Sequence, residues 1–209
     1  MADTVADLRS DTHPDWRTYA PLELPPILAH ALDSFVERGY HATTVRELAR
    51  RVGVTVPALY YHYANKQAIL VELLFGSLDS VLGRCRTSLT EAGDDPVDRF
   101  SALVECVVLY MTHRAPLAFL DTEMRSLEPD NRARYVALRD ELEGLLREAV
   151  RDGVATGVFT TPVPVDAGRA VLAMCQAVAQ WYRPDGPLPP DRIAERYVTI
   201  ALDAVGHRR

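Results

Sequence analysis

The chain has 209 residues, of which a quarter are charged and 48% are hydrophobic, an ordinary composition for a globular protein. No apolar run reaches the roughly 18 residues of a membrane span, and residues 1–24 lack the apolar stretch of a secretory signal. Three widely separated cysteines predict reduced thiols instead of a disulfide framework or a metal site. We therefore expect a cytoplasmic protein that carries no metal or cofactor.

The net charge of −6 is spread unevenly along the chain. Residues 1–24 carry five acidic residues and two arginines, and residues 76–209 carry twenty acidic residues and sixteen arginines. Residues 25–75 carry five basic and four acidic residues and are the least acidic part. Because salt screens the attraction of phosphate over roughly 10 Å, acidic flanking regions do not exclude nucleic-acid binding by this segment.

The first 24 residues are polar, interrupted by prolines and without clear periodicity. They predict a flexible N-terminal arm, in which Trp16 and Tyr19 are candidates to dock on the rest of the chain. The pair Pro25-Pro26 suits the first turn of a helix. Apolar residues then recur every three or four positions, which predicts a helix that ends at Gly39.

Capping residues mark the starts of the next three predicted helices. Thr44 and Glu47 have the spacing of a capping box, in which each side chain satisfies an amide at the helix start. Gly53 ends that short helix, Thr55 can cap a third helix, and Asn65 can cap a fourth. A capped helix, a glycine turn and a second capped helix are typical of a helix-turn-helix.

The third helix of such a unit buries the side around Leu59 and leaves its other side in water. That exposed side carries small, hydroxyl and imidazole groups, which suit close approach and hydrogen bonding in a DNA groove. These residues are Thr55, Ala58, Tyr61 and His62, with Tyr60 at the edge.

Three further side chains are candidates to contact backbone phosphate. Thr44 and Arg46 lie at the start of the preceding helix. Lys66 is the only lysine in the chain and lies at the N-terminus of the fourth helix. A positive charge there adds to backbone amides that already favour an anion.

Beyond residue 75 the periodicity predicts helices only. One follows the turn Asp94-Asp95-Pro96, and a second runs from Pro116 toward Leu127. Longer helices are expected over residues 131–156, 165–182 and 190–205. No alternating strand segment of useful length is present. We therefore expect an all-α fold with a flexible arm (1–24), a helix-turn-helix domain (25–74) and a larger helical domain for ligand binding and dimerisation (75–209).

Apolar, aromatic and sulfur-containing residues from several of these helices could enclose a ligand, since pockets between bundled helices are common binding sites. The candidates are Leu103, Val107, Tyr110, Met111, Phe119, Met124, Tyr135, Leu138, Leu142 and Met174. An ordinary core position is the alternative for each of them. Arg114 and Arg125 could pair with a ligand carboxylate or phosphate. Their alternative is a salt bridge to Asp121, Glu123 or Glu128.

The last two predicted helices each carry an apolar stripe that could form a dimer interface. Two copies of the chain would join these faces into a four-helix contact with twofold symmetry. The candidates are Ala167, Ala170, Val171, Met174, Val178, Trp181, Ile193, Tyr197, Ile200, Ala201 and Val205. The alternative is burial inside one subunit.

Residues 25–74 resemble the DNA-binding domain of the TetR family. The resemblance rests on the runs from Gly39 to Ala49, Gly53-Val54-Thr55, Ala58 to Tyr63, and Asn65-Lys66. It implies an all-helical homodimer with about nine helices that binds an operator and is released by a ligand in the C-terminal domain, with repression as the family default. The phosphate-contacting tyrosine and lysine of the family match Tyr60 and Lys66. Its groove-reading residues match Thr55, Val56, Pro57, Ala58, Tyr61 and His62.

The chain departs from many TetR-family members at Val56-Pro57, where they have a basic residue and a glycine. This departure removes one positive charge from the third helix. Residues 122–127, 135–140, 181–188 and 193–197 are similar to a branch of the family tied to fatty-acid or steroid-acid catabolism. That likeness implies an acyl-CoA, or another hydrophobic acid derivative, as the effector.

Two other functions compete with the regulator. An all-α enzyme would need a site, but the sequence has no paired Glu-x-x-His motif, no His-Glu-x-x-His motif and no glycine-rich phosphate loop. His113 and Cys106 are two turns apart on one predicted helix and make only a weak catalytic pair. A helical adaptor would use residues 55–62 to bind a protein instead of DNA. We expect no catalytic residue.

Overall fold

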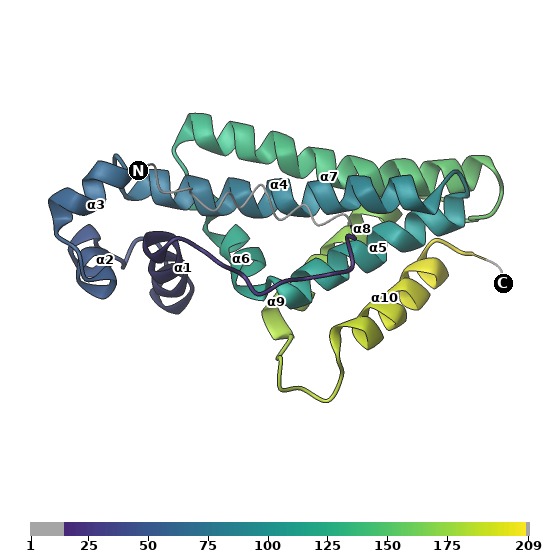
Figure 1. The fold of residues 1–209 in the computed structure, drawn as a ribbon. Coiled ribbons are helices and arrows are strands. Elements are labelled where there is room, and N and C mark those ends of the chain that lie inside the picture. Colours follow the sequence, from purple (N-terminus) through teal and green to yellow (C-terminus); the bar gives the residue numbers. More distant parts are fainter. Residues whose placement is uncertain (1–14, 208–209) are drawn as a thin grey trace.

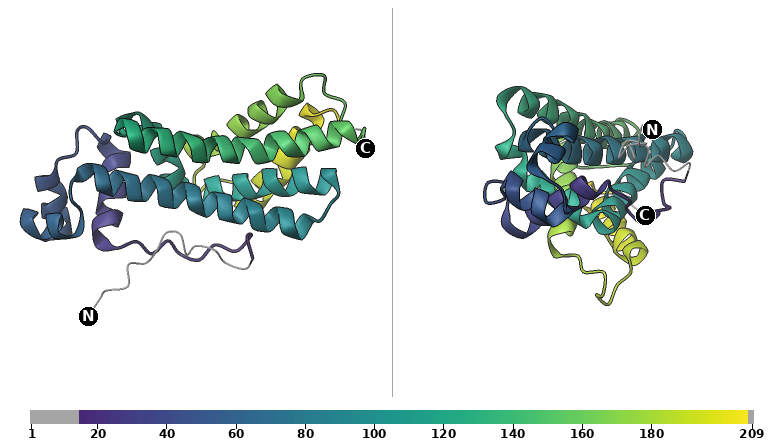
Figure 2. Two further views of the ribbon diagram at one scale, coloured as in Figure 1. Left: turned by 90° about the horizontal axis from the view of Figure 1, so that it is seen from above. Right: turned by 60° about the vertical axis from the view of Figure 1, so that its left-hand side comes forward.

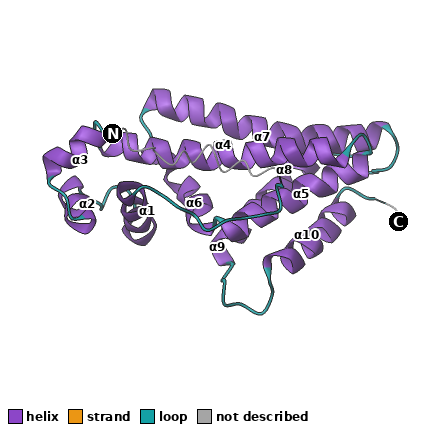
Figure 3. Ribbon diagram, in the orientation of Figure 1, coloured by secondary structure: helices purple, strands orange, loops and turns teal. Residues whose placement is uncertain are grey.

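The computed structural model describes residues 15–207, and the regular secondary structure of that part consists of helices joined by loops (Figures 1 and 3). The expected all-α fold is confirmed. A small three-helix unit lies at one end of the molecule, and a larger helical bundle forms the rest (Figure 1).

The small unit consists of α1 (Pro26–Arg38), α2 (Val45–Val52) and α3 (Val56–His62). The two threonine caps form as the sequence predicts. Thr44 Oγ1 accepts a hydrogen bond from Glu47 N, and Thr55 Oγ1 accepts one from Ala58 N, both at 3.2 Å. Gly53 ends α2 in the left-handed conformation, with φ at 80°. The other half of the predicted capping box does not form, because the Glu47 carboxylate pairs with Arg38 of α1.

Helix α4 (Lys66–Ala92) connects this unit to the bundle. Asn65 caps its first turn by accepting a hydrogen bond from Ala68 N at 2.8 Å. Helix α7 (Pro129–Ala155) lies beside α4 and runs in the same direction for most of its length (Figures 1 and 2). The two long helices thus make a frame that reaches from the three-helix unit to the far end of the molecule.

Helix α5 (Pro96–His113) forms the centre of the bundle and packs against α4, α7, α8 (Pro164–Gln176) and α10 (Pro190–Ala204). It is apolar on nearly all sides and correspondingly buried, as expected of a central helix. Within the described residues no single helix has the length and composition of a membrane span; α5 and the next helical segment meet that test only together, across a 99° bend.

Two predicted helices are interrupted in the structure. The segment from Pro116 toward Leu127 divides into α6 (Ala115–Phe119) and a 3-10 helix, η2 (Leu120–Ser126). The segment over 165–182 breaks at Ala177, between α8 and the short helix α9 (Val178–Trp181). Both interruptions border the same cavity, described below.

Residues 15–24, here called the strap, lie along α4 and α5 (Figures 1 and 2). Trp16 is fully buried, and its indole nitrogen donates to Glu91 at 2.9 Å. The buried guanidinium of Arg84 donates to the carbonyls of Trp16 and Thr18, at 2.9 and 3.0 Å. The expectation of a flexible arm therefore does not hold for this segment, because the bundle satisfies its carbonyls and buries its tryptophan. Residues 1–14 lie outside the described residues.

Candidate functional site

Helix α3 presents its predicted contact face to solvent at the tip of the molecule (Figure 1). Leu59 is fully buried beneath it, whereas Tyr61 is 87% exposed and Tyr60 is 47% exposed. Thr55, Pro57, Ala58 and His62 are also exposed. Val56 is the exception, because it packs partly against the hydrophobic core. This arrangement leaves α3 free to enter a groove of matching width.

The candidates for phosphate contact have different surroundings. Arg46 is exposed at the start of α2, and so is Thr44, whose hydroxyl also serves as the cap. Lys66 Nζ donates to the carbonyls of Tyr40 and Thr43, both at 2.7 Å, and lies 4.0 Å from the centre of the Tyr40 ring. Burial lowers the pKa of its ammonium group. Lys66 thus stabilises the α1–α2 turn (residues 39–44) in the free protein.

Two ion pairs reduce the outward positive charge of the three-helix unit. Arg51 donates to Glu37 at 2.8 Å and holds the pKa of that carboxyl below its usual value. Arg38 has the same effect on the pKa of Glu47. These pairs link α1 to α2. Phosphate attraction by this unit therefore depends on the other basic groups, Arg46, Arg50 and Lys66.

A half-open cavity of about 210 Å³, here called the inner cavity, lies between the helices of the bundle. Its lining residues come from α4, α5, α6, η2, α7, α8 and α9. Five predicted pocket residues line it: Tyr110, Met111, Phe119, Tyr135 and Leu142. Its polar lining comes from Ser77, Asp121, Thr122, Arg139, Gln176 and Gln180. The cavity can hold a compact apolar group with polar contacts near its wall.

The hydrogen bonds around the inner cavity fix its aromatic walls. Tyr135 donates its phenol proton to Asp121 at 2.9 Å, and the Tyr110 and Ser77 hydroxyls lie 3.0 Å apart. Burial, followed by the charge of Asp121, raises the pKa of Tyr135, which keeps the phenol protonated. Arg139 Nε lies 3.6 Å from the same aspartate. Asp121 therefore joins one tyrosine and one arginine at the cavity wall.

The other predicted pocket residues are placed elsewhere. Leu103 and Val107 are fully buried core residues, and Met124, Leu138 and Met174 pack partly against the core. Arg125 is exposed. Arg114 is buried and donates to the Ala20 carbonyl at 3.0 Å, so it holds the strap. None of these seven residues lines the inner cavity.

Arg139 and Asp121 are two of the lining residues that the sequence did not predict. A signal was available for Arg139, since it follows Tyr135 by four positions and precedes Leu142 by three, which places all three on one side of a helix. The position of Asp121 depends on the break between α6 and η2, which the apolar periodicity does not reveal.

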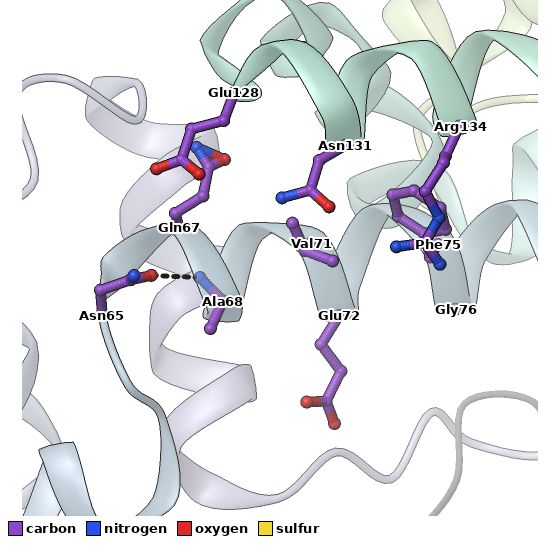
Figure 4. A pocket seen from close by; sticks show the side chains of 10 residues that line it. All are labelled: Asn65, Gln67, Ala68, Val71, Glu72, Phe75, Gly76, Glu128, Asn131 and Arg134. Atoms are coloured by element: carbon purple, nitrogen blue, oxygen red, sulfur yellow. Dashed lines mark hydrogen bonds between the residues drawn. The ribbon is translucent and has the colours of Figure 1, made fainter.

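Two grooves lie near the inner cavity. The α7–α8 groove, of about 210 Å³, shares Arg139, Ala173 and Gln176 with it and also contains Arg169. The α4–α7 groove, of about 520 Å³, lies between the first turns of those helices (Figure 4). Phe75 in the α4–α7 groove lies 5.5 Å, between ring centres, from Tyr135 of the inner cavity.

The predicted dimer residues divide into two groups. Val171, Val178, Ile193, Ala201 and Val205 are buried in the core of the single chain, as the alternative interpretation holds. Ala170, Trp181 and Ile200 are exposed, and Ala167, Met174 and Tyr197 are half-buried. Trp181 and Tyr197 stack with their ring centres 6.4 Å apart. A second subunit could contact only the latter six.

Comparison with known proteins gives two matching family models. One, described as "Bacterial regulatory proteins, tetR family", matches residues 27–73, and one described as "Tetracyclin repressor-like, C-terminal domain" matches residues 93–205. The chain belongs to the TetR family. This TetR-family chain is therefore a DNA-binding transcriptional regulator with an N-terminal helix-turn-helix and a C-terminal helical domain, as the resemblance implied.

Individual relatives are similar to this TetR-family regulator over most of their length. The HTH-type transcriptional repressor KstR2 of Rhodococcus jostii (strain RHA1) is 31% identical over 86% of this chain and 89% of its own. The crystal structure of the TetR-family regulator PfmR from Thermus thermophilus matches with a TM-score of 0.78 and 35% identity, over 88% of this chain and 99% of its own. The structure of AibR in complex with isovaleryl coenzyme A and operator DNA matches with a TM-score of 0.73 and 25% identity, over 83% of this chain and 95% of its own.

Proposed function

We propose that this regulator is a homodimeric repressor whose two α3 helices bind an operator and whose effector is a coenzyme A thioester. The outward α3, joined through α4 to a bundle with an inner cavity, is the observation that carries the proposal. The name of KstR2 supports repression, and the AibR complex supports a thioester effector in this family.

The inner cavity and the adjoining α7–α8 groove suit the acyl group and the phosphate-bearing part of such an effector, respectively. The inner cavity, of about 210 Å³, suits a compact acyl group and is too small for a whole coenzyme A. The adjoining α7–α8 groove contains Arg139 and Arg169 together with Asp140 and Glu143, and Arg169 pairs with Glu143 at 2.9 Å. Guanidinium groups bind phosphate well, so a phosphate in this groove would take the place of the Glu143 carboxylate on Arg169. We therefore place the acyl group in the inner cavity and the anionic part beside these arginines.

DNA binding through α3 is tested with promoter fragments from the host genome in a gel-shift assay at low salt. We expect wild-type protein to retard at least one fragment, and Tyr61→Ala to bind it more weakly with an unchanged melting temperature, because Tyr61 is almost fully exposed. An exposed substitution away from α3, Arg132→Ala, is the matched control. No retarded fragment would instead favour the protein-binding adaptor.

The effector class is tested by thermal unfolding with isovaleryl, hexanoyl and decanoyl coenzyme A and with free coenzyme A. A ligand that binds only the folded state raises the melting temperature, by mass action. We expect at least one thioester to stabilise the protein more than free coenzyme A does, with Arg139→Ala weakening the effect and Arg132→Ala leaving it intact. A melting temperature that no thioester raises contradicts this effector class.

A further inference from the structure

The η2 segment contacts both the inner cavity and the DNA-binding unit. Asp121 and Thr122 line the cavity, while Glu123 and Ser126 reach the α1–α2 turn. We propose that Glu123 is the positioning residue that couples occupancy of the inner cavity to the orientation of the helix-turn-helix. This inference rests on the proposed function, and it adds a second link to the covalent one through α4.

Both carboxylate oxygens of Glu123 accept hydrogen bonds, one from the α1–α2 turn and one from the end of η2. Its Oε1 accepts a hydrogen bond from Tyr40 N at 3.0 Å, and its Oε2 accepts one from Ser126 Oγ at 3.0 Å. Ser126 Oγ in turn lies 3.1 Å from His41 Nε2. Hydrogen bonds to an ionised group are stronger than those between neutral groups. One carboxylate thus fixes the backbone of the turn and orients the hydroxyl that meets the next residue.

The close approach of Glu123 depends on Gly39. This glycine has φ at 82°, a conformation that L side chains rarely adopt. A Cβ atom built at this position would lie 3.2 Å from Glu123 Oε1, tighter than an ordinary contact. The glycine that ends α1 therefore also leaves room for the carboxylate.

Helix α4 also binds the α1–α2 turn at Tyr40. Glu123 binds the amide nitrogen of Tyr40, and Lys66 binds its carbonyl oxygen. Gln67, on the first turn of α4, donates through Nε2 to the Ser126 carbonyl at 3.0 Å. The start of α4, the end of η2 and the α1–α2 turn therefore form one junction. A shift of η2 relative to α4 must change the hydrogen bonds at Tyr40.

The cavity wall offers a way to produce that shift. Asp121 precedes Glu123 by two residues in a 3-10 helix, whose hydrogen bonds are weaker than those of an α-helix. An anionic ligand that pairs with Arg139 competes with Asp121 for that guanidinium. Asp121 would then be held by Tyr135 alone, the start of η2 would shift and move Glu123, and the helix-turn-helix would lose the orientation in which it binds DNA. Ligand and operator would thus oppose each other by coupling of their binding free energies.

The test compares Glu123→Ala with Glu123→Gln, whose amide oxygen can still accept a hydrogen bond from Tyr40 N. Operator affinity is measured by fluorescence anisotropy, with and without a saturating amount of the tightest-binding thioester of the three above. For wild-type protein we expect the ligand to weaken operator binding by about 5- to 150-fold, the usual range of allosteric coupling. For Glu123→Ala we expect the operator dissociation constants with and without ligand to be nearly equal, and the affinity for the ligand to be unchanged. For Glu123→Gln we expect the ligand to weaken operator binding about as much as in the wild-type protein.

Glu148→Ala removes the same charge from an exposed position on α7 and is the matched control, with an expected ligand effect on operator affinity like that of wild type. A Glu123→Ala protein that responds fully would overturn the coupling role while leaving the proposed function intact. A wild-type protein whose operator binding no thioester weakens would instead overturn the proposed function. If Glu123→Ala unfolds, loss of the response in folded Glu123→Gln contradicts the role of the Tyr40 contact, and its retention supports it.

Discussion

At the scale of single residues, Lys66 has a structural role that its position in the sequence does not reveal. A lysine at a helix start is typical of a phosphate contact. In the structure its ammonium group also satisfies two carbonyls of the α1–α2 turn. The same residue therefore stabilises the free protein and can contribute to DNA binding.

We predict that Lys66→Met lowers the free energy of unfolding by about 1 to 3 kcal/mol, because two partly buried carbonyls lose their donor. Urea unfolding measures this effect. The role in phosphate binding is measured separately, from operator affinity at several salt concentrations. Loss of one phosphate contact reduces the slope of the logarithm of the binding constant against the logarithm of the salt concentration by about one. Unchanged stability together with a reduced slope would leave only the phosphate role.

At the scale of elements, the strap is a structural part of the bundle. Two buried arginines, Arg84 and Arg114, donate to its carbonyls, and Tyr19 stacks on His113 with ring centres 4.3 Å apart. Because the strap leads directly into α1, it also ties the helix-turn-helix to α4 and α5 (Figure 1). The DNA-binding unit is therefore held by the strap, by α4 and by Glu123.

We predict that Trp16→Ala destabilises the protein by about 3 to 5 kcal/mol, the usual cost of removing a fully buried tryptophan side chain. Thermal and urea unfolding measure the loss. The neighbouring Arg17→Ala removes exposed ion pairs to Glu91 and Glu105, so its effect should be about 1 kcal/mol or less. Equal and small effects for both variants would mean that the strap is not bound in solution.

At the scale of the whole molecule, the proposed homodimer depends on apolar side chains that the single chain leaves exposed. Trp181 and Ile200 are each 48% exposed, and Tyr197 stacks on the former. One helix-turn-helix reads few base pairs, so two copies about 34 Å apart are expected on an operator. An isologous contact through these side chains would join the two copies.

We predict that Ile200→Asp converts the dimer to a monomer, because the interface would have to bury an unpaired carboxylate. Sedimentation equilibrium measures the subunit number, and anisotropy measures the accompanying loss of operator affinity. Thr90→Asp places the same charge at an exposed position on α4 and should leave both unchanged. A dimeric Ile200→Asp protein would show that the contact lies elsewhere.

The local signals in the sequence determined the helices and the outward side of α3. Thr44, Thr55, Asn65 and Gly53 act within a few residues of themselves, so their effect can be predicted without a fold. Apolar periodicity correctly predicted that Leu59 is buried, whereas Ala170, Trp181 and Ile200 of the apolar stripes on the last two predicted helices are exposed. It also predicted five of the residues that line the inner cavity.

Only the tertiary structure decided which side chains meet across the molecule. Glu123 and Tyr40 are 83 positions apart, Arg84 and Trp16 are 68 apart, and Arg114 and Ala20 are 94 apart. Periodicity reports that a side chain is buried, but not which element it is buried against. The lining of the inner cavity, the position of the strap and the contact of Glu123 with the α1–α2 turn all follow from that packing.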